Sequence, residues 1–210
     1  MISQKFFNYK FNKIKDEDNF FVNITNKNAY DITILDNFDQ NIFLYGPRKS
    51  GKSQLVNFWL KKNNAILFKK NFSQIIKTKN NIAIDDALLT NTEEDLFHII
   101  NHCKSFNLKL FLTSSIHLNS HIFKLQDLYS RLKELFFLEI NNPDDEMCKM
   151  LMTKLFIDKQ IIIKNKEIFD YILKRVNRSY IDINRFVQKI DNLSLEKKRQ
   201  LTIPLIKEII

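Results

Sequence analysis

One short stretch of the chain has the residue types and spacing needed to hold a phosphate group. It reads Gly46-Pro47-Arg48-Lys49-Ser50-Gly51-Lys52-Ser53 and fits the pattern G-x-x-x-x-G-K-[ST]. The chain has two glycines, both in this stretch, whereas average usage of roughly 7% would give about fifteen. We interpret the stretch as a phosphate-binding loop whose backbone requires glycine.

The chemistry of such a loop follows from its backbone and from two side chains. Consecutive N–H groups surround the phosphates of a nucleotide, and the following helix directs its positive end toward them. A side chain on Gly51 would obstruct that approach. We expect Lys52 to reach the β- and γ-phosphates and the Ser53 hydroxyl to bind Mg²⁺. The cofactors predicted for residues 46–53 are therefore ADP or ATP, with Mg²⁺.

Two adjacent acids follow the loop at a suitable distance. Asp85 and Asp86 come directly after the apolar run Ile82-Ala83-Ile84. In an ATPase, we expect Asp85 to hold Mg²⁺ through water and Asp86 to orient the attacking water. The alternative is a strand end followed by an Asp-Asp turn or helix cap.

The elements that would position these residues alternate between two hydrophobic patterns. Short apolar runs predict strands at 41–45, 65–68, 81–84, 108–113 and 136–140, and helical periodicity predicts helices at 53–63, 93–105 and 127–134. This alternation is typical of a parallel sheet covered by helices on both faces.

The pattern changes after Pro143. No further strand is predicted, and helical patterns occupy 144–159, 165–177, 181–193 and 203–210. We therefore divide the chain into a polar, basic tail at 1–16, an α/β nucleotide-binding domain at 17–142 and a small all-α domain at 143–210.

Composition excludes several classes of protein. The hydrophobic fraction of 44% supports a folded core, and two cysteines cannot form a disulfide framework. No apolar run approaches the roughly 18 residues that span a bilayer, and the start has no signal-peptide pattern. We expect a cytoplasmic protein with no membrane contact. The net charge of +9 is spread along the chain and is typical of a solvated surface.

Two histidine pairs have the i, i+4 spacing that can share a metal on a helix. They are His98/His102 and His117/His121, and neither has the carboxylate of an H-E-x-x-H motif. We interpret these side chains as solvated histidines.

Four segments together resemble a known family. They are Leu125-Gln-Asp-Leu-Tyr-Ser-Arg131-Leu132, the helix start at Pro143-Asp-Asp-Glu-Met147, the ending Lys198–Ile210, and Phe21-Val22 with Asn26 and Ala29. These are similar to the Hda branch of the DnaA-related AAA+ ATPases, and the resemblance covers nearly the whole chain. It implies a five-stranded parallel sheet of order 5-1-4-3-2 with a helical lid, and contact of Phe21 and Val22 with adenine.

The resemblance also implies a function. Proteins of the Hda type work with the sliding clamp on DNA and make DnaA hydrolyse its ATP. Arg131 would be the catalytic arginine finger, supplied in trans to a DnaA subunit, where such a residue is worth roughly 10³–10⁵ in rate. Gln4, Phe6, Phe7 and Tyr9 resemble a degenerate clamp-binding peptide. The implied partners are DnaA and the clamp of DNA polymerase III, with DNA contacted through the clamp; a homodimer is also possible. We expect no DNA-reading helix-turn-helix domain after the lid.

The sequence departs from the family in its sensor residues. Asp182 occupies the lid position where DnaA has an arginine, and we expect Arg178 and Arg185 to pair with it. Ser114 or Ser115 occupies the sensor position on the fourth strand, where DnaA has an aspartate. A carboxylate facing a triphosphate repels it, so we expect weak hydrolysis by the chain's own site and a preference for ADP.

Two other functions are compatible with these residues. One is an autonomous AAA+ ATPase, such as a helicase loader, and the other is a nucleotide-locked adaptor that recruits DnaA without catalysis. ATPase activity of the isolated protein separates the first from the rest, and stimulation of DnaA separates the regulator from the adaptor.

Overall fold

The sheet of this protein is parallel throughout. The computed structural model describes residues 20–35, 38–68, 79–163 and 165–210. In that part of the chain five strands pair in the order β2-β3-β4-β1-β5, which confirms the predicted order 5-1-4-3-2. The strands are β1 (Ile42–Tyr45), β2 (Ile66–Leu67), β3 (Ile82–Ile84), β4 (Leu110–Ser114) and β5 (Phe136–Glu139).

The central strands are buried on both faces, which explains their uninterrupted apolar sequences. Phe43 of β1 lies opposite Leu112 of β4 and Phe137 of β5. Every residue of β3 and β4 is buried. Strand β5 is at one edge, and there Leu138 is buried while Phe137 and Glu139 are exposed.

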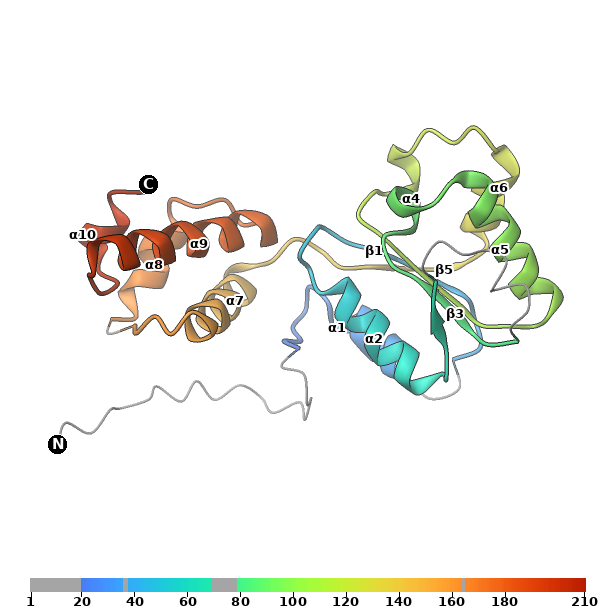
Figure 1. Ribbon diagram of the computed structural model, residues 1–210, viewed down its shortest axis with the longest axis horizontal. Coiled ribbons are helices and arrows are strands. Elements are labelled where there is room, and N and C mark those ends of the chain that lie inside the picture. Colours follow the sequence, from blue (N-terminus) through green and yellow to red (C-terminus); the bar gives the residue numbers. More distant parts are fainter. Residues whose placement is uncertain (1–19, 36–37, 69–78, 164) are drawn as a thin grey trace.

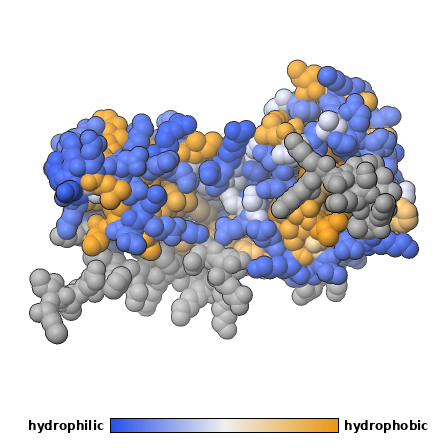
Figure 2. Space-filling view, viewed as in Figure 1, coloured by the Kyte–Doolittle hydropathy of each residue, from blue (hydrophilic) through white to orange (hydrophobic). Residues whose placement is uncertain are grey.

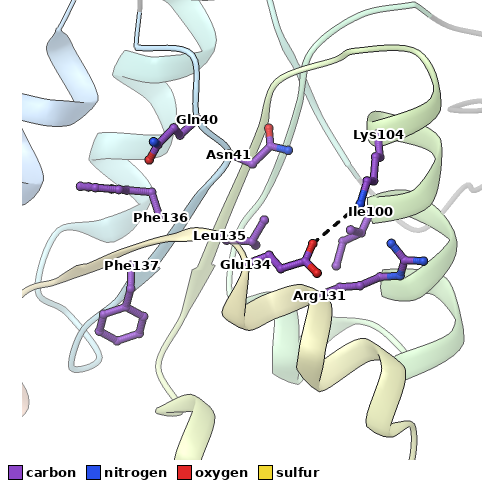
Figure 3. Close-up of a pocket in the computed structure, with 9 residues that line it drawn as sticks. All are labelled: Gln40, Asn41, Ile100, Lys104, Arg131, Glu134, Leu135, Phe136 and Phe137. Carbon is purple, nitrogen blue, oxygen red and sulfur yellow. Dashed lines mark ion pairs between the residues drawn. The ribbon is translucent and has the colours of Figure 1, made fainter.

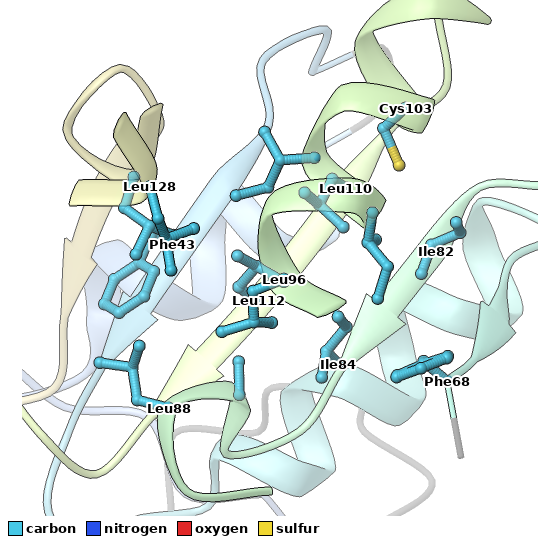
Figure 4. Packing of buried hydrophobic residues seen from close by; sticks show 14 of the residues in the cluster. Phe43, Phe68, Ile82, Ile84, Leu88, Leu96, Cys103, Leu110, Leu112 and Leu128 are labelled. Carbon is cyan, nitrogen blue, oxygen red and sulfur yellow. The ribbon is translucent and has the colours of Figure 1, made fainter. Parts of the chain in front are cut away.

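Helices cover the two faces of the sheet (Figure 1). On one face, α1 (Lys27–Ile34) and α2 (Lys52–Lys62) enclose a cluster that includes Leu44, Trp59 and Phe111. On the other face, a second cluster packs beneath the remaining helices (Figure 4). Those helices are α4 (Ala87–Thr90), α5 (Glu93–Ser105) and α6 (Gln126–Lys133), with a 3₁₀ turn at Leu118–Ser120.

The C-terminal part of the chain is helical and has its own buried cluster, which includes Met152, Phe156 and Ile183. Three of its helices begin at side chains that accept a hydrogen bond from the first turn, as N-caps do: Asp144, Ser179 and Thr202. The helices are α7 (Asp145–Asp158), α8 (Glu167–Leu173), α9 (Tyr180–Lys197) and α10 (Ile203–Ile206).

The helical part is attached to the α/β part at the segment that precedes α1. The Asn23 side chain donates a hydrogen bond to the Asp144 carboxylate, 2.9 Å long, and the Asn141 N–H donates to the Thr25 carbonyl. Tyr180 of α9 belongs to the buried cluster beneath α1 and α2. The segment before α1 therefore contacts both the α/β part and the start of the helical part.

Most predicted elements are present, with small shifts at their ends. Helix α5 has the predicted bounds, whereas α8 and α10 are shorter than the predicted 165–177 and 203–210. The sequence analysis missed α1 and α4. Helix α4 is a single turn of four residues, too short to show a 3.6-residue period.

The outer surface in Figure 2 is mainly hydrophilic, with separate apolar patches on both parts. Within the described residues, no helix is long and apolar enough to cross a membrane.

Candidate functional site

The predicted phosphate-binding loop connects β1 to α2. Gly51 is the N-cap of α2 and has a φ of 94°, in the left-handed region that favours glycine. A Cβ built on Gly51 would lie 2.6 Å from Cε2 of Phe20, and one on Gly46 would lie 3.0 Å from Cβ of Ile140. Close packing therefore disfavours a side chain at both positions, and backbone conformation does so at Gly51 as well.

Lys52 is buried and folds back over the loop. Its Nζ donates hydrogen bonds to the carbonyl oxygens of Gly46, at 2.7 Å, and Pro47, at 2.9 Å. Burial lowers the pKa of Lys52, while the nearby carboxylates Asp86 and Asp85 oppose that effect. The ammonium group is thus held over the loop, where it could donate hydrogen bonds to phosphate oxygens in place of these carbonyl oxygens.

Ser53 and Asp85, the two predicted Mg²⁺ ligands, are in contact. The Ser53 hydroxyl donates to one oxygen of Asp85 at 2.5 Å, and the Thr113 hydroxyl donates to the other at 2.6 Å. Hydroxyl and carboxylate oxygens are the donors that Mg²⁺ prefers. The structure therefore brings this predicted pair together, 32 residues apart in sequence.

Asp86 lies beside the end of β4. It has a φ of 52°, and its backbone N–H donates to the Thr113 hydroxyl at 2.9 Å. Its carboxylate accepts hydrogen bonds from the N–H of Ser115, at 2.7 Å, and from the hydroxyl of Ser115, at 2.9 Å. The second predicted acid is thus oriented by the predicted sensor residue.

The two sensor candidates, Ser114 at the end of β4 and Ser115 directly after it, have different surroundings. The Ser114 hydroxyl donates to the carbonyl of Ile116 and accepts from its N–H, at 2.7 and 2.9 Å. Ser114 therefore caps the local backbone, and Ser115 is the serine that contacts Asp86.

The segment predicted to contact adenine lies between the loop and the helical part. Phe21 and Val22 are half-buried against the cluster beneath α1 and α2. The Asn26 side chain donates to the carbonyl of Phe21 at 2.7 Å, and Lys154 of α7 lies over the Phe21 ring, 5.8 Å from its centroid. Both the α/β part and the helical part thus shape this segment.

The environment of Asp182 corrects one expectation. Ser179 caps α9, and Asp182 accepts a hydrogen bond from the Ser179 hydroxyl at 2.8 Å and pairs with Arg185 at 3.3 Å. Arg178, however, pairs with Asp145 of α7 instead. The expected Arg178–Asp182 pair was wrong because Arg178 precedes Ser179, the N-cap of α9, so helical spacing does not apply to it, and α7 presents an acid 33 residues away.

Arg131 lies on α6, near the edge of the sheet formed by the amino ends of the strands. The predicted phosphate-binding loop lies at the opposite edge, formed by their carboxyl ends. The Arg131 guanidinium is over the Phe97 ring, 5.2 Å from the centroid. Arg131 lines a groove of about 510 Å³ together with Asn41 and Phe136 (Figure 3). Asn41 directly precedes β1, and Phe136 is the first residue of β5. The loop, by contrast, follows the other end of β1. Four residues of strand, about 13 Å, separate these edges.

The loop and its surroundings fit a bound nucleotide. The Ser50 hydroxyl is buried and, among the described residues, has no hydrogen-bond partner. Such orphaned groups are costly unless a ligand or water satisfies them. With the Lys52 ammonium held over the loop and α2 beginning directly after Gly51, the arrangement suits an anionic phosphate.

Other sequence predictions have plainer outcomes. The prediction of solvated histidines is wrong for the second pair, because His117 packs edge-on against Tyr45 at 5.0 Å and His121 lies 3.6 Å from the Glu93 carboxylate. No cluster of three His, Cys, Asp or Glu that could bind metal is found in the described ranges. Burial raises the pKa of Cys103 to about 12 and that of Cys148 to about 11, so these thiols are poor nucleophiles. The clamp-peptide residues Gln4, Phe6, Phe7 and Tyr9 lie outside the described residues.

Two residues of this region escaped the sequence analysis. Thr113 joins both acids, and its only signal was a polar residue in a buried strand. Glu93 accepts hydrogen bonds from the backbone N–H groups of Lys124 and Leu125, at 3.1 and 2.7 Å, just before α6. Glu93 therefore fixes the start of the helix that carries Arg131.

Comparisons with known proteins identify relatives of the chain. A family model described as the Hda lid domain matches residues 147–210. The replication initiator DnaA of Buchnera aphidicola subsp. Cinara cedri is 27% identical over 205 residues, covering 84% of this chain and 46% of that protein. The chain thus spans about half the length of that relative. An uncharacterized protein of Haemophilus influenzae is 25% identical over 186 residues, 80% of each chain.

Solved structures share the fold. Domain III of DnaA from Thermotoga maritima matches with a TM-score of 0.71 at 16% identity, covering 91% of this chain and 95% of that one. AMPPCP-bound DnaA from Aquifex aeolicus matches with a TM-score of 0.64 at 21% identity, covering 85% and 66%. The RuvB motor of Thermotoga maritima matches at 0.61 and 14%, covering 80% and 60%. The chain has an AAA+ fold, and its sequence is similar to the Hda lid domain over residues 147–210 and to DnaA over most of its length.

Proposed function

We propose that this protein is a nucleotide-bound regulator that acts at the sliding clamp and stimulates ATP hydrolysis on DnaA through Arg131. The observation that carries the proposal is the position of Arg131. Arg131 lines a groove at the edge formed by the amino ends of the strands, opposite the chain's own phosphate-binding loop. From that edge the guanidinium is available to a neighbouring molecule.

The surroundings of Arg131 would allow its guanidinium to reach into the nucleotide site of another protein. Arg131 is only partly buried, and its contact with the Phe97 ring leaves the planar group able to reorient. Glu134 in the same groove is paired with Lys104, at 3.8 Å, so a cation already balances the nearest acid on α6. A guanidinium can bridge two phosphate oxygens and balance the charge that develops during phosphoryl transfer.

The chain's own site has the parts needed to bind nucleotide. Lys52 and the loop N–H groups would hold the phosphates, and Ser53 and Asp85 would hold Mg²⁺, whose charge would balance that of the phosphates. Phe21 and Val22 would contact the base beside the helical part. We propose that this helical part, residues 143–210, is a lid on the nucleotide. A nucleotide at this site would join the two parts and so order the molecule for its partner.

The proposal includes attachment to the clamp through the N-terminal peptide with Gln4, Phe6, Phe7 and Tyr9. The sequence similarity to clamp-binding peptides supports it. Bringing this protein and DnaA together on the same DNA would raise the local concentration of Arg131 at the DnaA triphosphate.

The decisive assay is single-turnover hydrolysis of ATP preloaded on DnaA, with clamp on DNA and this protein added. Arg131→Ala should lower the stimulation by about 10²-fold or more, because the lost interaction forms mainly in the transition state. Arg131→Lys should restore little, since a point ammonium lacks the planar fork.

A matched control is available on the same helix. Lys133 is also a cation over a ring, 4.3 Å from the Tyr129 centroid, so Lys133→Ala should leave stimulation intact. Melting temperature and nucleotide affinity should be nearly unchanged for Arg131→Ala. Undiminished stimulation by Arg131→Ala would mean that the catalytic arginine lies elsewhere. No stimulation by the wild-type protein would identify a non-catalytic adaptor, and high ATPase activity without DnaA would identify an autonomous ATPase.

A further inference from the structure

The end of β4 contacts both acids of the candidate site. Thr113 is fully buried, and its single hydroxyl donates to the Asp85 carboxylate while accepting from the Asp86 N–H. The first acid is thereby directed toward Ser53, which donates to its other oxygen. Strand β4 therefore fixes where the backbone of the second acid lies.

The carboxylate of Asp86 is held by one residue. The N–H and hydroxyl of Ser115 lie 2.7 and 2.9 Å from one oxygen of Asp86, and the hydroxyl lies 3.1 Å from the other. The segment that presents Ser115 is itself fixed, since Ser114 is bonded in both directions to the Ile116 backbone. Asp86 cannot turn away without losing these bonds.

A carboxylate that orients an attacking water must direct a free lone pair at that water. In this structure the Asp86 carboxylate faces two donors at the end of β4, the N–H and the hydroxyl of Ser115, and these donors fix the direction of its remaining lone pairs. The Ser115 hydroxyl is also occupied, because its hydrogen bonds the carboxylate. The acid and the sensor residue thus satisfy each other.

We propose that Ser115 is a positioning residue that holds Asp86 against β4 and keeps ATP hydrolysis by this chain slow. The inference rests on the proposed function, because it concerns ATP bound at the same site. Its consequence is a site that retains nucleotide intact while Arg131 acts on a partner.

The test measures single-turnover ATP hydrolysis by the isolated full-length chain. Ser115→Ala removes the hydroxyl bonds and keeps the backbone N–H. The rate constant should rise about five- to tenfold, the effect of releasing one hydrogen bond, with the affinity for ATP changed less than about twofold. Adding Asp86→Asn to Ser115→Ala should abolish the gain, because the gain requires the freed carboxylate.

Thr90→Ala is the matched control. The Thr90 hydroxyl bonds the backbone carbonyls of Asp85 and Asp86, at 3.2 Å each, and does not touch their carboxylates. Its removal should leave the rate constant unchanged. A purely structural role for Ser115 would lower the melting temperature of Ser115→Ala without raising the rate.

A second readout needs no nucleotide. In the free chain, Asp86→Ala removes the acceptor of the Ser115 N–H, so exchange of that amide hydrogen should accelerate at least about tenfold. An unchanged or lower hydrolysis rate in Ser115→Ala, a selective loss of ATP affinity, or unchanged amide protection would each overturn the inference. Faster hydrolysis by Ser115→Ala, together with no stimulation of DnaA by the wild-type protein, would support the inference and refute the proposed function.

Discussion

Replacing Gly51 with alanine should destabilise the fold by two separable effects. The residue has a φ of 94°, and placing an L-residue in the left-handed region costs roughly 1–2 kcal/mol. The new Cβ would also meet Cε2 of Phe20 at 2.6 Å, closer than real Cβ contacts. Overpacking of this kind typically costs about 1–3 kcal/mol. We therefore expect the free energy of unfolding to fall by about 2–5 kcal/mol.

The steric part depends on whether Phe20 can move. Its ring stacks on Tyr30 at 5.6 Å and meets Phe58 edge-on at 5.9 Å, so neighbouring rings restrain it. Phe20→Ala removes the obstructing ring. In that background, Gly51→Ala should cost only the backbone part, about 1–2 kcal/mol.

Urea unfolding of the four proteins in this double-mutant cycle measures the coupling. Gly46→Ala is the comparison, since its contacts of 3.0 Å to Ile140 and 3.1 Å to Ser50 are less severe and its φ is ordinary. It should cost less than Gly51→Ala. An equal cost of Gly51→Ala with and without Phe20 would refute the steric reasoning.

Three further predictions concern nucleotide binding, the start of α6 and residues 1–10. Lys52→Ala should abolish nucleotide binding in calorimetry, and the wild-type protein should bind ADP more tightly than ATP because Asp182 is acidic; equal affinities would contradict the preference. Partial burial raises the pKa of Glu93, but hydrogen bonds from the N–H groups of Leu125 and Lys124 outweigh it and hold the pKa below the usual 4.5. The stabilisation from ionised Glu93 is therefore present above that value and lost on acidification, so the stability advantage of wild type over Glu93→Gln should shrink between about pH 6 and pH 3 in urea titrations. Deleting residues 1–10 should abolish clamp binding in a pull-down and leave the melting temperature nearly unchanged; retained binding would place the clamp contact elsewhere.

The sequence by itself determined the loop, the strands and most helices. These features depend on neighbouring residues: the spacing from Gly46 to Lys52, apolar runs that suit strands buried on both faces, and the period of amphipathic helices. Parallel pairing followed from the alternation of strands and helices. The strand order came from the resemblance to a family, and the structure confirms it.

Other features of the site depended on tertiary structure. Thr113 and Ser115 reach Asp85 and Asp86 across 27–29 residues because β3 and β4 pair in parallel, with Ile84 opposite Leu112. No local pattern encodes that register, so sequence spacing could not tell which serine contacts Asp86.

The choice of ionic partners was also tertiary. Helical spacing predicted Arg178 near Asp182, but Arg178 precedes the N-cap of α9 and pairs with Asp145 of α7. Charged side chains are long and pair with the acid that packing brings closest, whichever element carries it. The sequence thus supplied the chemical groups of the site, and the packing of strands and helices decided which of them meet.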